Sequence, residues 1–248
     1  MPLVSIVTPI YNAQNTLTEC INSILAQGFT DYELLLINDE STDDSLRIAE
    51  LFAAKNANIK VFFNQYQKGI AGARNTALAH ATGRYIAFLD ADDAWLPQKL
   101  EQQLHFMQKN NAAFSFTAYK TMDSNGAKSH KQISAPSTIC YHAYLKNTII
   151  GCLTVMIDRA QTGGFLVPNL RTSEDMALWL LIFKRGFVAH GLNEPLAYYR
   201  QSPKSATSNK LKAAQDVWFV YREIEKLGFL YSSFCLCCYA FHALKKRL

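Results

Sequence analysis

The sequence predicts an α/β fold, with a mostly parallel sheet covered by helices on both faces and a helical extension at the C-terminus. Short apolar runs alternate with amphipathic helical patterns through about the first ninety residues, in the order β-α-β-α-β-α-β that builds such a sheet. The run at 85–89 (YIAFL) is typical of a strand buried on both faces. Two further helical patterns, at 209–227 and 229–248, follow the sheet-forming part.

The first half is expected to hold strands at 3–7, 32–37, 60–63 and 85–89, with helices at 17–25, 41–55 and 70–81. Asn15 or Thr16 would cap the first helix, and residues 16–19 (TLTE) match a capping box. Cys20 falls on the apolar stripe of that helix and is therefore expected in the core.

The second half is less regular. A helix is expected at 96–109, opening at Pro97, followed by a strand at 112–119 and a hairpin turn at 123–126. Residues 127–140 are polar and are expected to form a loop, and a short strand is expected at 154–157. Ser173 is a candidate N-cap for a helix reaching Arg185.

A chain of 248 residues is long enough for one large domain, or for one domain with an appendage. We expect a catalytic domain at 1–205, with a nucleotide-binding half at 1–93 and an acceptor half at 94–205, and an extension at 206–248. No G-x-G-x-x-G follows the first strand and no G-x-x-x-x-G-K-[ST] loop is present, so a diphosphate must be held in another way.

The charge of the chain is unevenly distributed. From Arg200 onward there are nine Lys and Arg against three Asp and Glu, which gives this part a net charge of +6. Residues 1–199 have a net charge of −1, and the two parts sum to the +5 of the whole chain. A basic and greasy tail favours an anionic membrane surface over nucleic acid as its neighbour. The six cysteines lack paired metal-binding spacing, and neither a signal peptide nor a run of roughly 20 apolar residues is seen. We therefore expect a cytoplasmic protein, peripheral at the inner face of the cytoplasmic membrane.

An acidic cluster, Asp90, Asp92 and Asp93, follows the strand at 85–89 directly. Three carboxylates in four residues repel one another unless a cation or water lies over them. Because ligands of open parallel sheets bind at the carboxyl ends of strands, this is a suitable place for a hard divalent ion that also holds a diphosphate. The alternative is a solvated acidic turn before a helix. Glu174 and Asp175 could likewise owe their place in the first turn of a helix to its dipole alone.

Five segments, in order along the chain, resemble motifs of the family 2 glycosyltransferases, which have the GT-A fold and invert the anomeric centre. They are 4–12 (VSIVTPIYN), 38–43 (NDESTD), 72–75 (GARN), 89–93 (LDADD) and 174–179 (EDMALW). The later segments 149–159, 194–200 and 209–214 are similar to bacterial teichuronic-acid and capsule glycosyltransferases in particular.

The resemblance implies a set of nucleotide-binding residues: Thr8, Pro9, Tyr11, Asp39, Arg74, Asp90 and Ala91. The first three would lie against the base. Asp39 would accept a hydrogen bond from a uracil N–H, Arg74 would support the base or the diphosphate, and Asp90 would reach the ribose or the donor sugar. The family usually has Asp where this chain has Asn38, which leaves one fewer negative charge near the base.

The resemblance also implies the chemistry. Asp92 would bind Mg²⁺ or Mn²⁺ across the phosphates, and Asp175 would be the catalytic base. Apart from the resemblance, Arg200, Ser202, Lys204 and Ser205 are candidates for a flap over the diphosphate, with an ordinary solvated loop as the equal alternative. The Q-x-x-R-W motif of processive members is absent, so we expect one sugar to be transferred per encounter.

The sequence thus predicts an inverting glycosyltransferase that moves a sugar from a nucleotide-sugar donor, with UDP as the first choice, to a saccharide or undecaprenyl-linked acceptor in bacterial surface-polysaccharide biosynthesis. The alternative is a non-catalytic nucleotide-sugar-binding or scaffold subunit, which the presence of all the acids disfavours. For the segment 229–248 membrane contact, packing on the core and a homodimer contact stay open.

Overall fold

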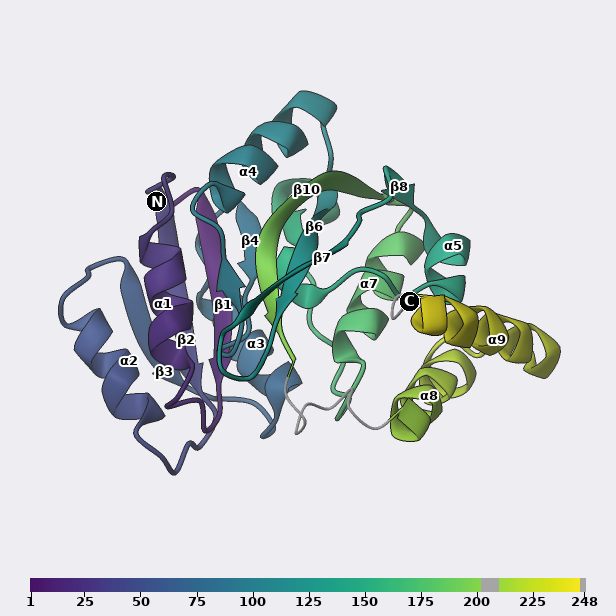
Figure 1. The fold of residues 1–248 in the computed structure, drawn as a ribbon, viewed down its shortest axis with the longest axis horizontal. Coiled ribbons are helices and arrows are strands. Elements are labelled where there is room, and N and C mark those ends of the chain that lie inside the picture. The colour runs from purple at the N-terminus through teal and green to yellow at the C-terminus, as the bar shows by residue number, and fades with distance from the viewer. Residues whose placement is uncertain (202–209, 246–248) are drawn as a thin grey trace.

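The computed structural model describes residues 1–201 and 210–245, and helices cover both faces of its central sheet (Figure 1). The described strands are β1 (Val4–Ile10), β2 (Tyr32–Asn38), β3 (Ile59–Phe63), β4 (Tyr85–Phe88), β5 (Ala94–Trp95), β6 (Phe114–Met122), β7 (Lys128–Ile133), β8 (Thr138–Ile139), β9 (Met156–Asp158) and β10 (Ala189–Arg200). Their order in the sheet is β3-β2-β1-β4-β9-β6-β10-β5, with β7 paired to β6 and β8 paired to β10.

Most of the sheet runs in one direction. Strands β1 to β4 are mutually parallel, and β6 is parallel to β10. The short strand β9 is antiparallel to both of its neighbours, β4 and β6, so the two parallel groups point the same way. The predicted α/β class with a mostly parallel sheet is confirmed.

Two apolar cores lie on the two faces of the sheet. The helices are α1 (Leu17–Leu25), α2 (Ser45–Ala53), α3 (Ile70–His80), α4 (Lys99–Asn110), α5 (Tyr141–Lys146), α6 (Arg159–Thr162), α7 (Glu174–Lys184), α8 (Lys210–Phe219) and α9 (Phe229–Lys245). One core joins the sheet to α1, α2 and α4, and Cys20 is buried there as predicted. The other joins it to α3, α5, α7, α8 and α9.

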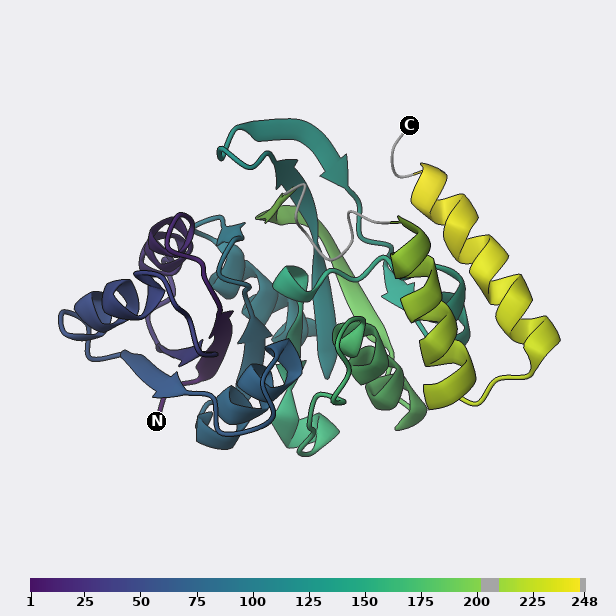
Figure 2. The same ribbon diagram turned by 90° about the horizontal axis from the view of Figure 1, so that it is seen from below.

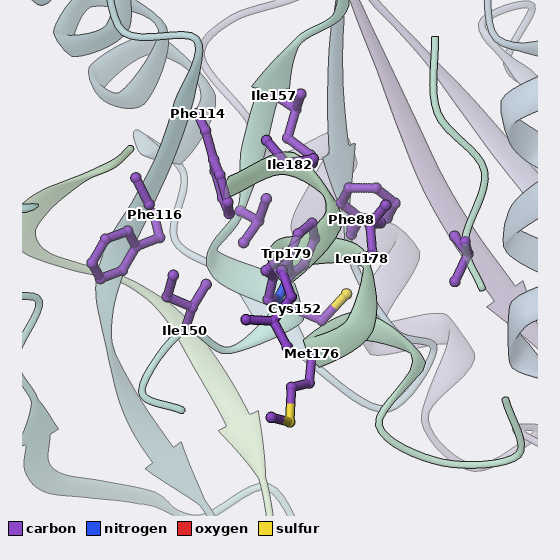
Figure 3. Packing of buried hydrophobic residues seen from close by; sticks show 14 of the residues in the cluster. Phe88, Phe114, Phe116, Ile150, Cys152, Ile157, Met176, Leu178, Trp179 and Ile182 are labelled. Atoms are coloured by element: carbon purple, nitrogen blue, oxygen red, sulfur yellow. The ribbon is translucent and has the colours of Figure 1, made fainter. Parts of the chain in front are cut away.

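Trp179 fixes α7 on the sheet. Its side chain is fully buried, and its ring centroid lies 5.7 Å from that of Phe88 in β4 and 5.2 Å from that of Phe114 in β6. Figure 3 shows the indole between these two rings, beside Cys152 and Met176. Because Trp179 is anchored in this way, the first turn of α7 is held close to the segment that follows β4.

Three local predictions are wrong. Ser173 directly precedes α7, but its side chain makes no capping hydrogen bond. Thr16 precedes α1, but its side chain makes no capping hydrogen bond, and Glu19 pairs with Arg200 instead of closing a capping box. Residues 127–140 contain the strands β7 and β8 where a loop is expected. The expected hairpin turn at 123–126 is confirmed, since the Asp123 amide donates to the Ala127 carbonyl between β6 and β7.

The C-terminal helices pack against the main body. Figures 1 and 2 place α8 and α9 at the opposite end of the molecule from α1 and α2. A π-helical turn (Val220–Ile224) follows α8, and within it Tyr221 is fully buried and donates to the Leu145 carbonyl. Glu225 accepts from Tyr141 Oη (2.7 Å) and Lys184 Nζ (2.8 Å). Throughout 1–201 and 210–245, no helix has both the length and the apolar character needed to cross a membrane.

Candidate functional site

Two adjoining cavities open where the parallel strands end. The first, of about 960 Å³, is lined by segments that complete β1, β2 and the acidic turn after β4. The second, of about 440 Å³, lies between α3, the start of α7 and α8. Ile70, Asp90 and Arg171 line both cavities, so a ligand in one would meet a ligand in the other at this shared wall. Cavities of this size at carboxyl strand ends are the usual ligand sites of such sheets.

Most of the residues predicted to contact the nucleotide line the first cavity. They are Pro9, Tyr11, Asp39, Asp90 and Ala91, and the predicted metal ligand Asp92 lines it as well. Thr8 does not line it, because its side chain is fully buried in the sheet with no hydrogen-bond partner for Oγ1. Arg74 lines the second cavity instead. The individual roles of these residues stay predictions.

Asp39 is held by two donors at the end of β2. Its carboxylate accepts from Asn64 Nδ2 (2.6 Å) and from the Gly69 amide (2.9 Å). Gly69 has a φ of +126°, a conformation that an L side chain rarely adopts, so glycine suits this position before α3. These two bonds orient Asp39 while each of its oxygens keeps a lone pair for a ligand.

Arg74 joins the two acidic parts of the site. Its guanidinium is buried, and Nη1 donates to Glu174 Oε1 (2.6 Å) while Nη2 donates to Asp90 Oδ1 (2.7 Å). The Arg74–Glu174 pair connects α3 to the first turn of α7, and the Arg74–Asp90 pair connects α3 to the acidic turn. One guanidinium therefore faces three carboxylates, those of Asp90, Glu174 and Asp175.

The surroundings of Asp175 change its pKa. Burial raises its pKa above the ordinary value, opposed by the charge of Arg74 and a hydrogen bond from the Met176 amide, and assisted by the charge of Asp90. Burial and the charge of Asp175 raise the pKa of Glu174 in the same way, against Arg74. A carboxylate with a raised pKa accepts a proton more readily near neutral pH than an exposed one.

The acidic turn is a tight structure. The Asp93 amide donates to the Asp90 carbonyl (3.0 Å), and the buried Asp93 carboxylate accepts from the Arg200 amide (2.8 Å). Burial and the charge of Asp90 raise the pKa of Asp92 to about 6. Two neighbouring carboxylates at the cavity wall would be relieved by a cation, and oxygen donors suit Mg²⁺ or Mn²⁺. Within the described ranges no three acidic, histidine or cysteine side chains form a metal site by themselves, so a bound diphosphate would have to complete the ligand set.

Arg200 ends β10 and lines the first cavity as a buried anchor. Its Nε donates to the Asp92 carbonyl (2.7 Å), Nη1 donates to the Asp123 carbonyl (3.3 Å), and Nη2 pairs with Glu19. One side chain thus ties the acidic turn to the β6–β7 turn and to α1. A role over the diphosphate stays a prediction, and the other three flap candidates, Ser205 among them, lie outside the described residues.

Three features of the site are absent from the predictions. Glu174 is an ion-pair partner of Arg74, Arg171 lies on the wall between the cavities, and Tyr119 and Tyr199 line the second cavity with ring centroids 6.2 Å apart. The Glu174–Asp175 dipeptide carried a signal for the first feature, because two adjacent acids in a buried turn need a cation. No pattern in the sequence pointed to the other two.

A cavity at the carboxyl ends of parallel strands, sharing a wall with a second cavity lined by Asp175, can hold two ligands next to each other. Residues 5–163 match the family model described as "Glycosyl transferase family 2". The chain is 49% identical over 247 residues, covering 100% of this chain and 98% of the relative, to "Putative teichuronic acid biosynthesis glycosyltransferase TuaG" of Bacillus subtilis (strain 168). It is also 41% identical to "UDP-Glc:alpha-D-GlcNAc-diphosphoundecaprenol beta-1,3-glucosyltransferase WfgD" of Escherichia coli. This match extends over 220 residues and covers 88% of this chain and 85% of the relative.

Solved structures share the fold. S. aureus TarS 1-349 in complex with UDP-GlcNAc superimposes with a TM-score of 0.71 at 22% identity, covering 95% of this chain and 70% of that one. The mannosyltransferase PcManGT from Pyrobaculum calidifontis, in complex with GDP-Man and Mn²⁺, superimposes with a TM-score of 0.69 at 16% identity. The match covers 95% of this chain and 70% of that one. The chain belongs to glycosyltransferase family 2, and the predicted GT-A fold is confirmed.

Proposed function

We propose that this protein is an inverting glycosyltransferase that transfers a sugar from a UDP-sugar to a lipid-linked saccharide during assembly of a bacterial surface polysaccharide. The observation that carries the proposal is that Asp92 and Asp175 line adjoining cavities with a common wall. A donor in the first cavity would therefore present its anomeric carbon to an acceptor in the second. The name of WfgD, a glucosyltransferase from UDP-Glc to a diphosphoundecaprenol-linked sugar, supports the substrate classes, and that of TuaG, from teichuronic acid biosynthesis, supports the surface polysaccharide.

In this proposal Asp175 is the base. An acceptor hydroxyl oxygen attacks the anomeric carbon, its proton passes to the Asp175 carboxylate, and the bond from that carbon to the diphosphate oxygen breaks with the electron pair leaving on the diphosphate. Because attack and departure occur on opposite sides, the configuration inverts. Asp92 would hold Mg²⁺ or Mn²⁺ together with the diphosphate oxygens, and such an ion, when bound, supplies positive charge to the leaving group.

The Asp175→Asn variant tests the function. We expect transfer to fall by about 100-fold or more, the contribution typical of a general base, while UDP binding with Mn²⁺ is kept. Transfer is followed by release of UDP in the presence of acceptor, and binding by calorimetry. Asp44→Asn, at an exposed position in an ion pair with Arg47, is the matched control and should leave both unchanged.

Asp92→Ala should abolish the Mn²⁺-dependent part of UDP binding, which Asp175→Asn should keep. If Asp175→Asn retains transfer, another residue is the base, and the neighbouring carboxylate of Glu174 is the next candidate. A wild-type protein that binds a UDP-sugar but transfers it to no acceptor would instead favour the non-catalytic binding or scaffold subunit.

A surface on α9 supports contact with a membrane. Leu230, Phe234, Cys237 and Phe241 are exposed and are spaced by four, three and four residues, so they lie along one side of the helix, and we call them the α9 stripe. Leu230 is 83% exposed and Phe241 65% exposed. Lys146 Nζ lies 5.4 Å from the Phe234 ring, so a cation borders the apolar surface. This combination suits an anionic lipid surface and would bring the enzyme to a lipid-linked acceptor at the inner face of the cytoplasmic membrane. A homodimer contact is the alternative.

A further inference from the structure

The walls of the two cavities carry seven acidic and four basic side chains. The acids are Asp39, Asp90, Asp92, Asp93, Glu174, Asp175 and Asp216, and the cations are Lys68, Arg74, Arg171 and Arg200. A nucleoside diphosphate adds further negative charge at the place where the bond breaks. Besides a divalent ion, direct contact between the protein and the diphosphate oxygens is favoured by a cationic side chain that the protein has not already neutralised.

Three of the four cations already have partners. Arg74 is shared between Asp90 and Glu174, and Arg200 is surrounded by Glu19 and by backbone carbonyls. Lys68 Nζ pairs with Glu40 (2.6 Å). Arg171 has no hydrogen bond or ion pair within the part of the chain that the structure describes, and its side chain is exposed to both cavities.

The loop that carries Arg171 is nevertheless well anchored. Asn75 on α3 exchanges two hydrogen bonds with the backbone of Val167, donating to its carbonyl (2.9 Å) and accepting from its amide (2.7 Å). Arg185 Nη1 donates to the carbonyls of Thr162 (3.0 Å) and Gly164 (2.9 Å). The backbone near Arg171 is therefore held in place while its guanidinium is available for a ligand, which reduces the entropy lost on binding.

We propose that Arg171 binds a diphosphate at the junction of the two cavities. A guanidinium can donate two parallel hydrogen bonds to phosphate oxygens, and Arg171 is placed where the donor cavity meets Asp175. The diphosphate is that of the donor nucleotide or that of a lipid-diphosphate-linked acceptor, two sources with the same chemistry. This inference rests on the proposed function only for the identity of the nucleotide and of the acceptor.

The test compares wild type with Arg171→Gln and Arg171→Lys. Calorimetry with Mn²⁺ measures binding of UDP, uridine and inorganic pyrophosphate. We expect Arg171→Gln to weaken the binding of UDP and of pyrophosphate by about tenfold, an effect typical of losing one charge-assisted hydrogen bond. The affinity for uridine should be unchanged. Arg171→Lys should recover part of the lost affinity, because lysine keeps the positive charge but cannot donate two parallel hydrogen bonds as a guanidinium does. Arg47→Gln, at an exposed arginine that lines neither cavity, is the control for loss of one positive charge.

The sources are separated by a second measurement, the KM for undecaprenyl-diphosphate-linked N-acetylglucosamine. If Arg171→Gln raises this KM by about tenfold with kcat kept and UDP binding unchanged, the diphosphate belongs to the acceptor. The inference is overturned if binding of UDP and pyrophosphate and the acceptor KM all match wild type while the melting temperature is also unchanged. A wild type that binds pyrophosphate through Arg171 but does not bind UDP would sink the proposed UDP donor and leave this inference standing.

Discussion

Among single side chains, Arg74 determines how the site is held together. It is the buried cation between Asp90 and Glu174, with Asp175 close by, and its loss would leave buried carboxylates without their counter-charge. The Arg74–Glu174 pair joins residues 100 positions apart in sequence. A role in organising the acids is compatible with the predicted support of the base or diphosphate.

Arg74→Met should therefore lower the free energy of unfolding by about 3–5 kcal/mol, the cost of breaking a buried ion pair by removing one partner. The double variant Arg74→Met, Glu174→Gln should be more stable than the sum of the two single changes predicts, because it removes one of the carboxylates left unpaired. Urea denaturation measures the free energy of unfolding of the two single variants and of the double variant. Arg47→Met, at an exposed pair, should change stability by less than about 1 kcal/mol. Strict additivity in the cycle would contradict this account.

The residues at strand ends could be predicted from the sequence, and the connections between them could not. Asp39, Asp90 and Asp92 each follow a buried strand, so the parallel sheet alone brings them to one edge. The approach of α7 depends on Trp179 packing against Phe88 and Phe114, a tertiary contact with no local signature. Thr8 has a motif position beside Pro9, yet the alternation of side chains along β1 directs it into the core.

Among strands and helices, one carboxylate on β2 adds side-chain links to the backbone pairing of this strand with β1 and β3. Glu33 on β2 is buried and accepts from Ser5 Oγ (2.7 Å) on β1 and from Lys60 Nζ (2.8 Å) on β3. It also accepts from the amide and the hydroxyl of Thr82 (both 2.7 Å), just before β4. Burial alone would raise the pKa of Glu33, but these bonds overcome it and lower the pKa to about 2. One side chain on β2 thus links β1, β3 and the turn that precedes β4.

This carboxylate should make the fold sensitive to acid. Because the pKa of Glu33 is about 2 in the folded state and about 4.5 when unperturbed, its contribution is full above pH 4.5 and is lost as the pH falls towards 2. The contribution near neutral pH is on the order of 3 kcal/mol. Glu33→Gln should lower stability at pH 6 and flatten the decline of the unfolding free energy between pH 5 and 2.5, measured by urea denaturation at each pH. Glu50→Gln, at an exposed position on α2, should keep the wild-type slope, and an equally steep decline in Glu33→Gln would refute the assignment.

The sequence did not predict β7, and it placed the start of β9 two residues too early. β7 has no buried residue, so its alternation carries no hydrophobic signal, and pairing with β6 alone specifies it. β9 is only three residues long and follows a 3₁₀ turn (Cys152–Thr154), which shifts its start from the expected position. Strands β1 to β4 were predictable because each is an apolar run bounded by polar residues.

For the protein as a whole, α9 has two different sides. Ser232 and Cys235 are buried towards the body of the protein, whereas the α9 stripe is exposed. Removal of 229–248 would therefore uncover part of the core, and substitutions in the stripe are the better probe of membrane binding.

Replacing Leu230, Phe234 and Phe241 with serine should abolish sedimentation with vesicles that contain an anionic phospholipid, because the apolar area that would enter the interface is lost. The melting temperature and UDP binding should be unchanged, since these side chains are exposed and line neither cavity. Leu51→Ser, an exposed leucine on α2, is the matched control. If the triple variant instead converts a wild-type dimer to a monomer in analytical ultracentrifugation, with vesicle binding absent in both, the stripe is a homodimer contact.

The exposed thiol of Cys237 gives the α9 stripe a natural attachment point for a chemical label. Cys20, Cys152 and Cys235 are buried, so replacement of Cys140 and Cys238 by serine would leave one accessible sulfur for a maleimide dye. An environment-sensitive fluorophore there would shift its emission to the blue on entering acyl chains, and quenchers fixed at known positions along the lipid would report how deep the helix lies. The same label would follow, in real time, whether the enzyme stays on one vesicle or exchanges between them from one turnover to the next.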